Sequence, residues 1–136
     1  MEALEARLGV ALPESYRSFL AASNGGRPER QAFAVPNHAE GFFEIQEFFG
    51  VSRDVQTSNI DWNAKAYRGV IPAALLPIAC DSCGSLICLG LGEEAAGRIY
   101  FWDCEEDLGD GSWLPTYEVA HSFDAFVAAL TVYPGS

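Results

Sequence analysis

Four cysteines are the side chains whose type and spacing come nearest to a metal or redox site. Cys80 and Cys83 are separated by two residues, as in zinc knuckles and redox dithiols. A zinc site usually pairs two such knuckles, whereas Cys88 and Cys104 stand singly in predicted strands. A redox dithiol opens a helix that lowers the thiol pKa, and here a glycine and an apolar run follow. We therefore expect reduced structural cysteines and no metal or other cofactor, with zinc binding and redox chemistry as the alternatives.

Carboxylates form the second concentration of chemically active groups. Five lie within the eight residues after Trp102, and two more lie in the predicted loop over residues 92–97. They are Asp103, Glu105, Glu106, Asp107 and Asp110, with Glu93 and Glu94 in the earlier loop. Such an oxygen-rich loop can bind calcium, but its spacing differs from that of the EF-hand loop. A glycosidase pair needs one carboxyl group whose pKa is raised by apolar burial, which a solvated cluster does not provide.

The acidic cluster is flanked by two aromatic side chains, Trp102 and Trp113. Carboxylates suit the lysines and arginines of a basic protein, and tryptophan supplies the apolar anchor that is typical of interface hot spots. We predict that the seven acids and the two tryptophans form a partner-binding surface. The alternative is a solvated turn that binds nothing.

Histidines and glycines give no support to an enzyme. His38 lies in a linker-like segment and His121 precedes a helix start, and neither has a serine or cysteine motif beside it. Gly90 and Gly92 flank a strand end without the helix or the lysine that completes a phosphate loop. We therefore expect no catalytic residues and no enzymatic activity.

The charge of the chain is strongly negative and unevenly distributed. The net charge is -11, and residues 70–136 carry ten acidic residues against one basic residue, Arg98. An acidic surface repels phosphate backbones, so we expect no binding to nucleic acid. It attracts a basic protein and accelerates the encounter at low salt. The alternative is that the charge serves only solubility.

Length and composition indicate one globular domain over residues 1–136. Apolar residues make up 49% and charged residues 20% of the chain, which is a globular composition. No apolar run approaches the length of a membrane helix, and the first residues are acidic where a secretory signal is basic. We expect a cytoplasmic protein that does not bind membranes; the sequence does not fix its oligomeric state, and a monomer is favoured over an oligomer.

An antiparallel sheet is expected to position these groups. Residues 86–91 are almost unbroken apolar and predict a strand buried on both faces. A hairpin loop over residues 92–97 leads to a returning strand over residues 99–102. Pro72 and Pro77 predict an irregular approach to the sheet. Further strands are predicted over residues 32–35, 42–49 and 113–120.

The strand over residues 42–49 has a mixed pattern. Alternation places Phe43, Ile45 and Phe49 on one face, and Glu47 interrupts it. The last turn of this segment is alternatively the start of a helix.

Helices are predicted at both ends of the chain and in its middle. Pro13 suits the first position of a helix, and Asn24-Gly25-Gly26 ends that helix. Ser122 is the predicted N-cap of a closing helix. The apolar stripes are Leu4 and Leu8; Tyr16, Phe19 and Leu20; Ile60, Ala64 and Tyr67; and Phe123, Phe126, Val127 and Leu130. The fold class is therefore α+β, an antiparallel sheet of about five or six strands with N-terminal helices and a C-terminal helix packed on it.

Several of these motifs together resemble one known family. The segment from Leu12 to Gly26, with its leucine-proline pair, aromatic-leucine stripe and asparagine-glycine-glycine turn, resembles the start of the SUKH superfamily, the Smi/Knr cell-wall-assembly-regulator type of domain. Residues 71–84 and 97–103 resemble the middle of such domains, and residues 122–130 resemble their end. The resemblance covers almost the whole chain. The chain departs from the family pattern at Cys83 and in its extra acids after Trp102.

The resemblance implies the same α+β architecture and a function. Many bacterial members of the superfamily are immunity proteins of polymorphic toxin systems, which bind a cognate toxin, often a nuclease, and block its active site. The resulting hypothesis is a non-enzymatic protein-binding module that neutralises a basic toxin domain. The alternatives are a regulatory scaffold in cell-wall or signalling control and, as a further reading, a zinc-binding module.

Overall fold

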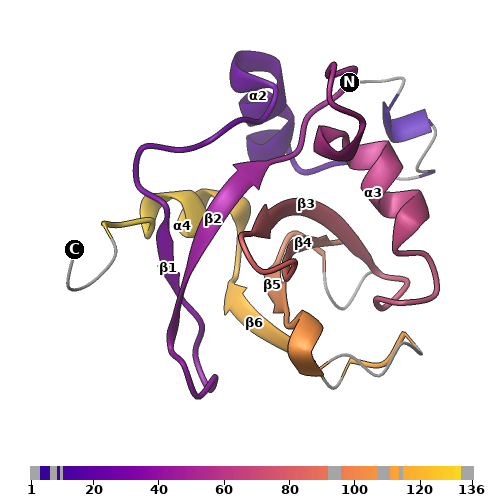
Figure 1. Ribbon diagram of the computed structural model, residues 1–136. Helices are drawn as coiled ribbons and strands as arrows, with labels where there is room; N and C mark the ends of the chain where they lie inside the picture. Colours follow the sequence, from indigo (N-terminus) through magenta and orange to yellow (C-terminus); the bar gives the residue numbers. More distant parts are fainter. Residues whose placement is uncertain are drawn as a thin grey trace.

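The computed structural model describes residues 4–6, 9, 11–91, 96–106, 111–113 and 115–132. Its centre is a six-stranded antiparallel sheet whose strands lie in the order of the sequence. They are β1 (Ala32–Ala34), β2 (Phe42–Phe48), β3 (Leu75–Asp81), β4 (Leu86–Gly90), β5 (Ile99–Trp102) and β6 (Thr116–Ala120). Figure 1 shows that the sheet is strongly curved. The expected α+β class and antiparallel sheet are confirmed.

Helices pack on the sheet where three of the four apolar stripes predicted them; the stripe of Leu4 and Leu8 cannot be followed, because Leu8 lies outside the described residues. The α-helices are α2 (Glu14–Ser23), α3 (Ile60–Ala66) and α4 (Phe123–Ala128), and the 3₁₀-helices are η1 (Gln56–Ser58) and η2 (Cys104–Glu106). In Figure 1, α4 lies behind β1 and β2, whereas α3 lies beside β3. Within the described residues, every helix is too short or too polar to serve as a bilayer-spanning segment.

Aromatic rings fill the core between the sheet and the helices α2 and α4. Phe123 of α4 packs edge-on against Tyr16 of α2, with ring centres 5.0 Å apart, and against Phe48 of β2 at 6.1 Å. On the opposite face of the sheet, Trp102 meets Tyr67, which follows α3, at 5.8 Å. Because both faces are covered, β4 is buried along its whole length, as its apolar run predicted.

The turn after α2 depends on an asparagine and a glycine. Asn24 ends the helix in the left-handed conformation, with φ of 49°, and its side-chain amide exchanges hydrogen bonds of 2.9 and 2.7 Å with the backbone of Val51. A Cβ atom on Gly25 would lie 2.6 Å from the carbonyl oxygen of Phe48, so the position requires glycine. The predicted end of the helix is confirmed, but Pro13 is the N-cap rather than the first helical residue.

The simple alternation predicted for β2 is wrong beyond Ile45. The pairing of β2 with β3 shifts register between Ile45 and Glu47, which is a β-bulge. The extra residue brings Phe48 to the buried side, and the Glu47 carboxylate accepts a hydrogen bond of 3.0 Å from the Ser58 hydroxyl. The strand continues to Phe48, so the alternative of a helical start there is also wrong.

Pro77 lies inside a central strand, which corrects the expectation of an irregular approach to the sheet. β3 begins at Leu75 and lies between β2 and β4. Its pairing with β4 shifts register between Pro77 and Ala79, and β2 pairs with β3 only from Ala79 onward. Pro77 therefore occupies an irregularity beyond the end of the β2 ladder, where a missing N–H costs little.

Hydrogen bonds fix both ends of α4. The hydroxyl oxygen of Ser122 accepts the N–H of Ala125 at 3.1 Å, so the predicted N-cap is confirmed. After the helix, Thr131 and Ala32 exchange two backbone hydrogen bonds of 2.9 Å. These bonds tie the segment after α4 to β1, the first strand of the sheet.

Candidate functional site

Three connections meet at one end of the sheet. In an antiparallel meander, alternate connections lie at the same end, so the β1–β2 turn, the β3–β4 turn and the segment after β5 come together. Between them lies a hollow of about 180 Å³ that five acidic residues line. We call it the acidic hollow; its acids are Glu40, Glu44, Asp81, Asp103 and Glu105.

The acidic hollow contains no arginine or lysine counter-charge among the described residues. No guanidinium or ammonium nitrogen of that part of the chain lies within 4.0 Å of its five carboxylates. The arginine ion pairs lie elsewhere, with Arg17 bound to Glu5 and Arg98 bound to Glu118. In a chain with a net charge of -11, this end of the sheet therefore presents negative potential that a basic partner can neutralise.

Asp81 is the buried carboxylate of the hollow that lacks a cationic neighbour in the described structure. Its residue is 7% exposed, and Oδ1 accepts the backbone N–H groups of Cys83 and Ser85 at 2.9 and 2.8 Å. Burial raises the pKa of the Asp81 carboxyl group, backbone hydrogen bonds partly offset this, and the charge of Asp103 adds to the rise. A cation in the hollow would favour the ionised form of Asp81.

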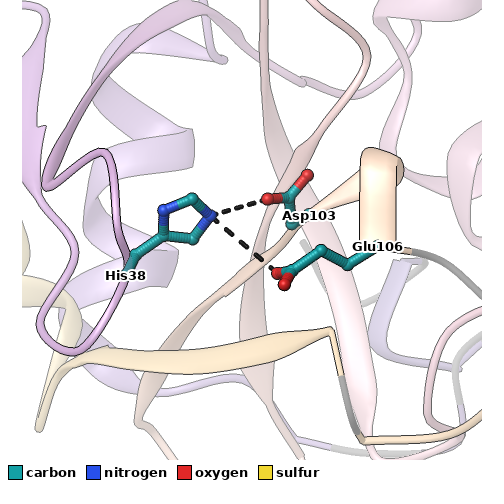
Figure 2. A group of neighbouring side chains, drawn as sticks. All are labelled: His38, Asp103 and Glu106. Carbon is teal, nitrogen blue, oxygen red and sulfur yellow. Dashed lines mark hydrogen bonds and ion pairs between the residues drawn. The ribbon is translucent and has the colours of Figure 1, made fainter.

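His38 joins two walls of the hollow. Its Nε2 lies 2.6 Å from Oδ2 of Asp103, and its Nδ1 accepts the backbone N–H of Glu40 at 3.1 Å. Because Nδ1 is an acceptor, the proton of the neutral ring is on Nε2, which donates to Asp103. The ring also packs edge-on against Phe43 at 4.8 Å. Figure 2 shows His38 directed at Asp103 and Glu106.

The same three side chains have donor atoms suited to a metal ion. The ligand atoms of His38, Asp103 and Glu106 lie within 4.8 Å of one another. A ligating histidine, however, normally donates its second ring N–H to an acceptor, whereas here Nδ1 faces the N–H donor of Glu40. Ligation through Nε2 would place a proton on Nδ1 against that donor. The hydrogen bonds therefore favour a structural role for His38 over metal ligation.

The histidine also lacks what a general base requires. Nε2 carries the proton shared with Asp103, and the lone pair of Nδ1 is occupied by Glu40. No ring nitrogen is left to accept a proton from a substrate.

Next to His38, the Tyr117 hydroxyl donates a hydrogen bond to Oε1 of Glu106 at 2.6 Å. This hydrogen bond is the main reason that the pKa of Tyr117 rises to about 12.

The cysteines do not converge on a metal site. All four are described, and the one group of described side chains close enough for a shared ion contains none of them. Burial and the Glu47 carboxylate raise the pKa of the Cys80 thiol to about 11, and burial raises that of Cys88 as well, whereas zinc needs thiolates. Cys104 lies on η2 rather than in a strand as predicted, and it donates its S–H to the carbonyl oxygen of Cys83 at 3.4 Å.

The structure places the two predicted tryptophans differently. Trp102 is 3% exposed and packs in the core, so its ring is not available to a partner as the protein stands. Trp113 is 46% exposed and meets Tyr100 edge-on at 5.4 Å. The hot-spot prediction can therefore apply to Trp113 alone.

The seven predicted acids differ in their burial and in whether the structure describes them. Asp103 is buried in the hollow, and Glu105 and Glu106 are exposed on η2. The other four acids lie outside the described residues: Glu93, Glu94, Asp107 and Asp110.

Sequence reasoning missed three acids and one histidine of this site. Glu40 and Glu44 come from the β1–β2 hairpin, and Asp81 ends β3. The meander order of the strands would have brought these turns together with the segment after β5. For His38 no spacing signal exists, because its partner is far away in the chain.

The comparison with known families is clear over nearly the full length. The model of the SMI1 / KNR4 family (SUKH-1) matches residues 1–129. Curated proteins include no match to this chain.

Proposed function

The chain belongs to the SMI1 / KNR4 family (SUKH-1), and from this premise we propose that it is a non-enzymatic immunity protein that binds and neutralises a cognate toxin. The toxin would be a basic domain of the nuclease type, encoded beside this chain in a bacterial polymorphic toxin system. The complex would form in the cytoplasm, where the toxin acts.

The observation that carries this proposal is the uncompensated charge of the acidic hollow. A nuclease holds phosphate in a groove lined by lysine and arginine, and an acidic surface of a second protein can occupy that groove. Two of the five acids, Asp81 and Asp103, are more than nine-tenths buried, so they are preorganised. The exposed acids Glu40, Glu44 and Glu105 surround them.

The proposed action is occlusion rather than chemistry. The two ring nitrogens of His38 are occupied, and burial raises the pKa of the Cys80 and Cys88 thiols, which disfavours a nucleophilic thiolate. These observations support a binding role. Trp113, exposed after η2, would supply an apolar contact at the edge of the complex.

Co-expression tests the proposal directly. The gene next to that of this chain is cloned, its product is expressed in a sensitive host, and survival is compared with and without this chain. We expect growth to be restored and the two proteins to co-purify. If the neighbouring product is not toxic, or if its toxicity persists while this chain is present and folded, the proposed function is wrong. Recovery of a different protein partner would favour the scaffold role instead.

A further inference from the structure

We propose that the acidic hollow is a receptor for one arginine side chain of the protein partner. The inference rests on the proposed function for the existence of that partner, and it goes further by naming the group that is recognised. The hollow measures about 180 Å³, whereas small-molecule pockets measure roughly 300–1,000 Å³. Its size therefore suits a single side chain rather than a cofactor or a metabolite.

Asp81 forms the charged floor of the receptor. Asp81 is only 7% exposed and lines the hollow. The hydrogen bonds that its carboxylate accepts come from backbone N–H groups of its own turn. No lysine, arginine or histidine nitrogen within the described residues lies within 4.0 Å of it. A buried carboxylate without a cation is costly, so a cation delivered by a partner gains more here than at an exposed acid.

Asp103, unlike Asp81, already has a hydrogen-bond partner on each carboxylate oxygen, so the incoming guanidinium is expected at the other acids of the hollow. One of its oxygens binds Nε2 of His38 and the other accepts the backbone N–H of Glu105 at 2.9 Å. Both oxygens are therefore occupied within the protein. The acids without such a side-chain partner in the described structure are Asp81 at the floor and the exposed Glu40, Glu44 and Glu105 around it.

The aromatic wall favours arginine over lysine. Phe42 is 37% exposed and lines the hollow, and it lies two residues before Glu44, so both side chains are on the same face of β2. A planar guanidinium can stack on a phenyl ring while its N–H groups reach a carboxylate on either side. The compact ammonium of lysine offers no plane to the ring and has a stronger hold on water.

Titration of the full chain with a minimal probe tests the receptor without any toxin. The probe is N-acetyl-arginine amide, and residue-resolved NMR shifts report where it binds. The neutral isostere N-acetyl-citrulline amide is the ligand control, and N-acetyl-lysine amide tests the preference for a planar group. We expect saturable shifts around residues 40–44 and 81–85 with the arginine probe, weaker binding of the lysine probe and none of the citrulline probe.

Two variants locate the charge that matters. Asp81→Asn keeps an oxygen acceptor for the turn N–H groups and removes the charge, and Glu44→Gln removes the charge of an exposed wall residue. Each should weaken the arginine probe by about tenfold, whereas Asp124→Asn on α4 should leave it unchanged. Circular dichroism confirms that each variant is folded.

The outcomes separate this inference from the proposed function. Equal shifts with the citrulline probe, shifts confined to other surfaces, no binding of the arginine probe, or wild-type titration of both hollow variants would overturn the receptor even if a toxin is neutralised. Arginine-specific binding that the two variants weaken would establish the receptor even if the neighbouring gene encodes no toxin.

Discussion

The imidazole of His38 donates a hydrogen bond from Nε2 to Oδ2 of Asp103 across 2.6 Å, although 65 positions separate the two residues in the chain. Their side chains are 7% and 8% exposed. The bond joins the β1–β2 turn to the segment that follows β5, and these are two walls of the acidic hollow. The shape of the proposed binding surface therefore depends on a buried polar contact between distant parts of the sequence.

Removal of the His38 ring should destabilise the protein. His38→Ala leaves the Asp103 carboxylate buried without its side-chain donor, and we expect a loss of roughly 2–3 kcal/mol in the free energy of unfolding. His38→Gln retains an N–H donor and should lose less. Urea unfolding measures both. The matched control is the exposed His121, whose replacement by alanine should change stability by less than about 0.5 kcal/mol; equal losses at the two histidines would refute the role of the His38–Asp103 bond.

The charge of Asp81 should make stability depend on pH in a direction opposite to that of a salt-bridged acid. The pKa of Asp81 is raised in the folded protein above its ordinary value of 3.8, mainly by burial, so the folded state holds this proton more tightly than the unfolded state. The stability that the group contributes is complete below pH 3.8 and is lost as pH rises through the folded pKa.

Asp81→Asn tests this sign because an amide does not titrate. The quantity compared is the free energy of unfolding of the variant minus that of the unmodified protein, from paired urea unfolding curves. We expect this difference to be more favourable to the variant at about pH 7 than at about pH 3. Because the other acids are present in both proteins, their titration contributes equally to both free energies of unfolding and drops out of the difference. A stability difference that is the same at both pH values, or that is larger in acid, would show that Asp81 is not penalised by burial.

Alanine substitutions of the two glycines after α2 should separate the steric cost of an added Cβ atom from the conformational cost of a left-handed backbone. Gly25 and Gly26 both have positive φ, 86° and 102°, but a Cβ atom meets the backbone of Phe48 and Phe49 only at Gly25. We expect Gly26→Ala to cost about 1–2 kcal/mol for the left-handed backbone alone, and Gly25→Ala to cost about 3 kcal/mol or more. Thermal and urea unfolding of the two variants provide the comparison, and similar losses would mean that the close approach to β2 is relieved cheaply.

Trp102 and Trp113 should differ in what their loss affects. Trp102 is buried, so Trp102→Ala should cost about 3–5 kcal/mol of stability. Trp113 is 46% exposed, so Trp113→Ala should cost less than about 1 kcal/mol and should instead weaken binding to the partner. Unfolding curves and calorimetric binding measurements distinguish the two. A folded Trp113→Ala variant with unchanged affinity would remove this residue from the interface.

Patterns of local sequence predicted most of the elements. The apolar run of β4 and the alternation of β5 identified the central strands, and the Ser122 N-cap and the turn at Asn24 identified two helix boundaries. These features succeed because their causes lie within a few residues. The bulges at Ile45–Glu47 and Pro77–Ala79 were not predictable in this way, because a register shift is decided by the partner strand.

The candidate site was predictable only in part. The acids after Trp102 were recognisable from composition, but burial divides them, and Trp102 belongs to the core because alternation turns it toward the face that α3 covers. The acids Glu40 and Asp81 join the site through the order of the strands. Their position depends on the whole meander and therefore cannot be inferred from any one segment.

The most direct test of the central claim is the affinity of the purified chain for the product of the neighbouring gene, which we propose to be the toxin, with the charge of the hollow reversed. Glu44→Lys combined with Glu105→Lys changes two exposed acids of the hollow, and Glu14→Lys combined with Asp124→Lys makes the same change in net charge on α2 and α4. Exposed charges contribute little to stability, so both double variants should fold.

Calorimetry at low salt should give a loss of about a hundredfold or more in affinity for the hollow variant and only a few-fold loss for the helix variant. Equal losses in the two variants would mean that net charge alone attracts the partner. Unchanged affinity in the hollow variant would contradict the account, because the acidic hollow would then take no part in binding.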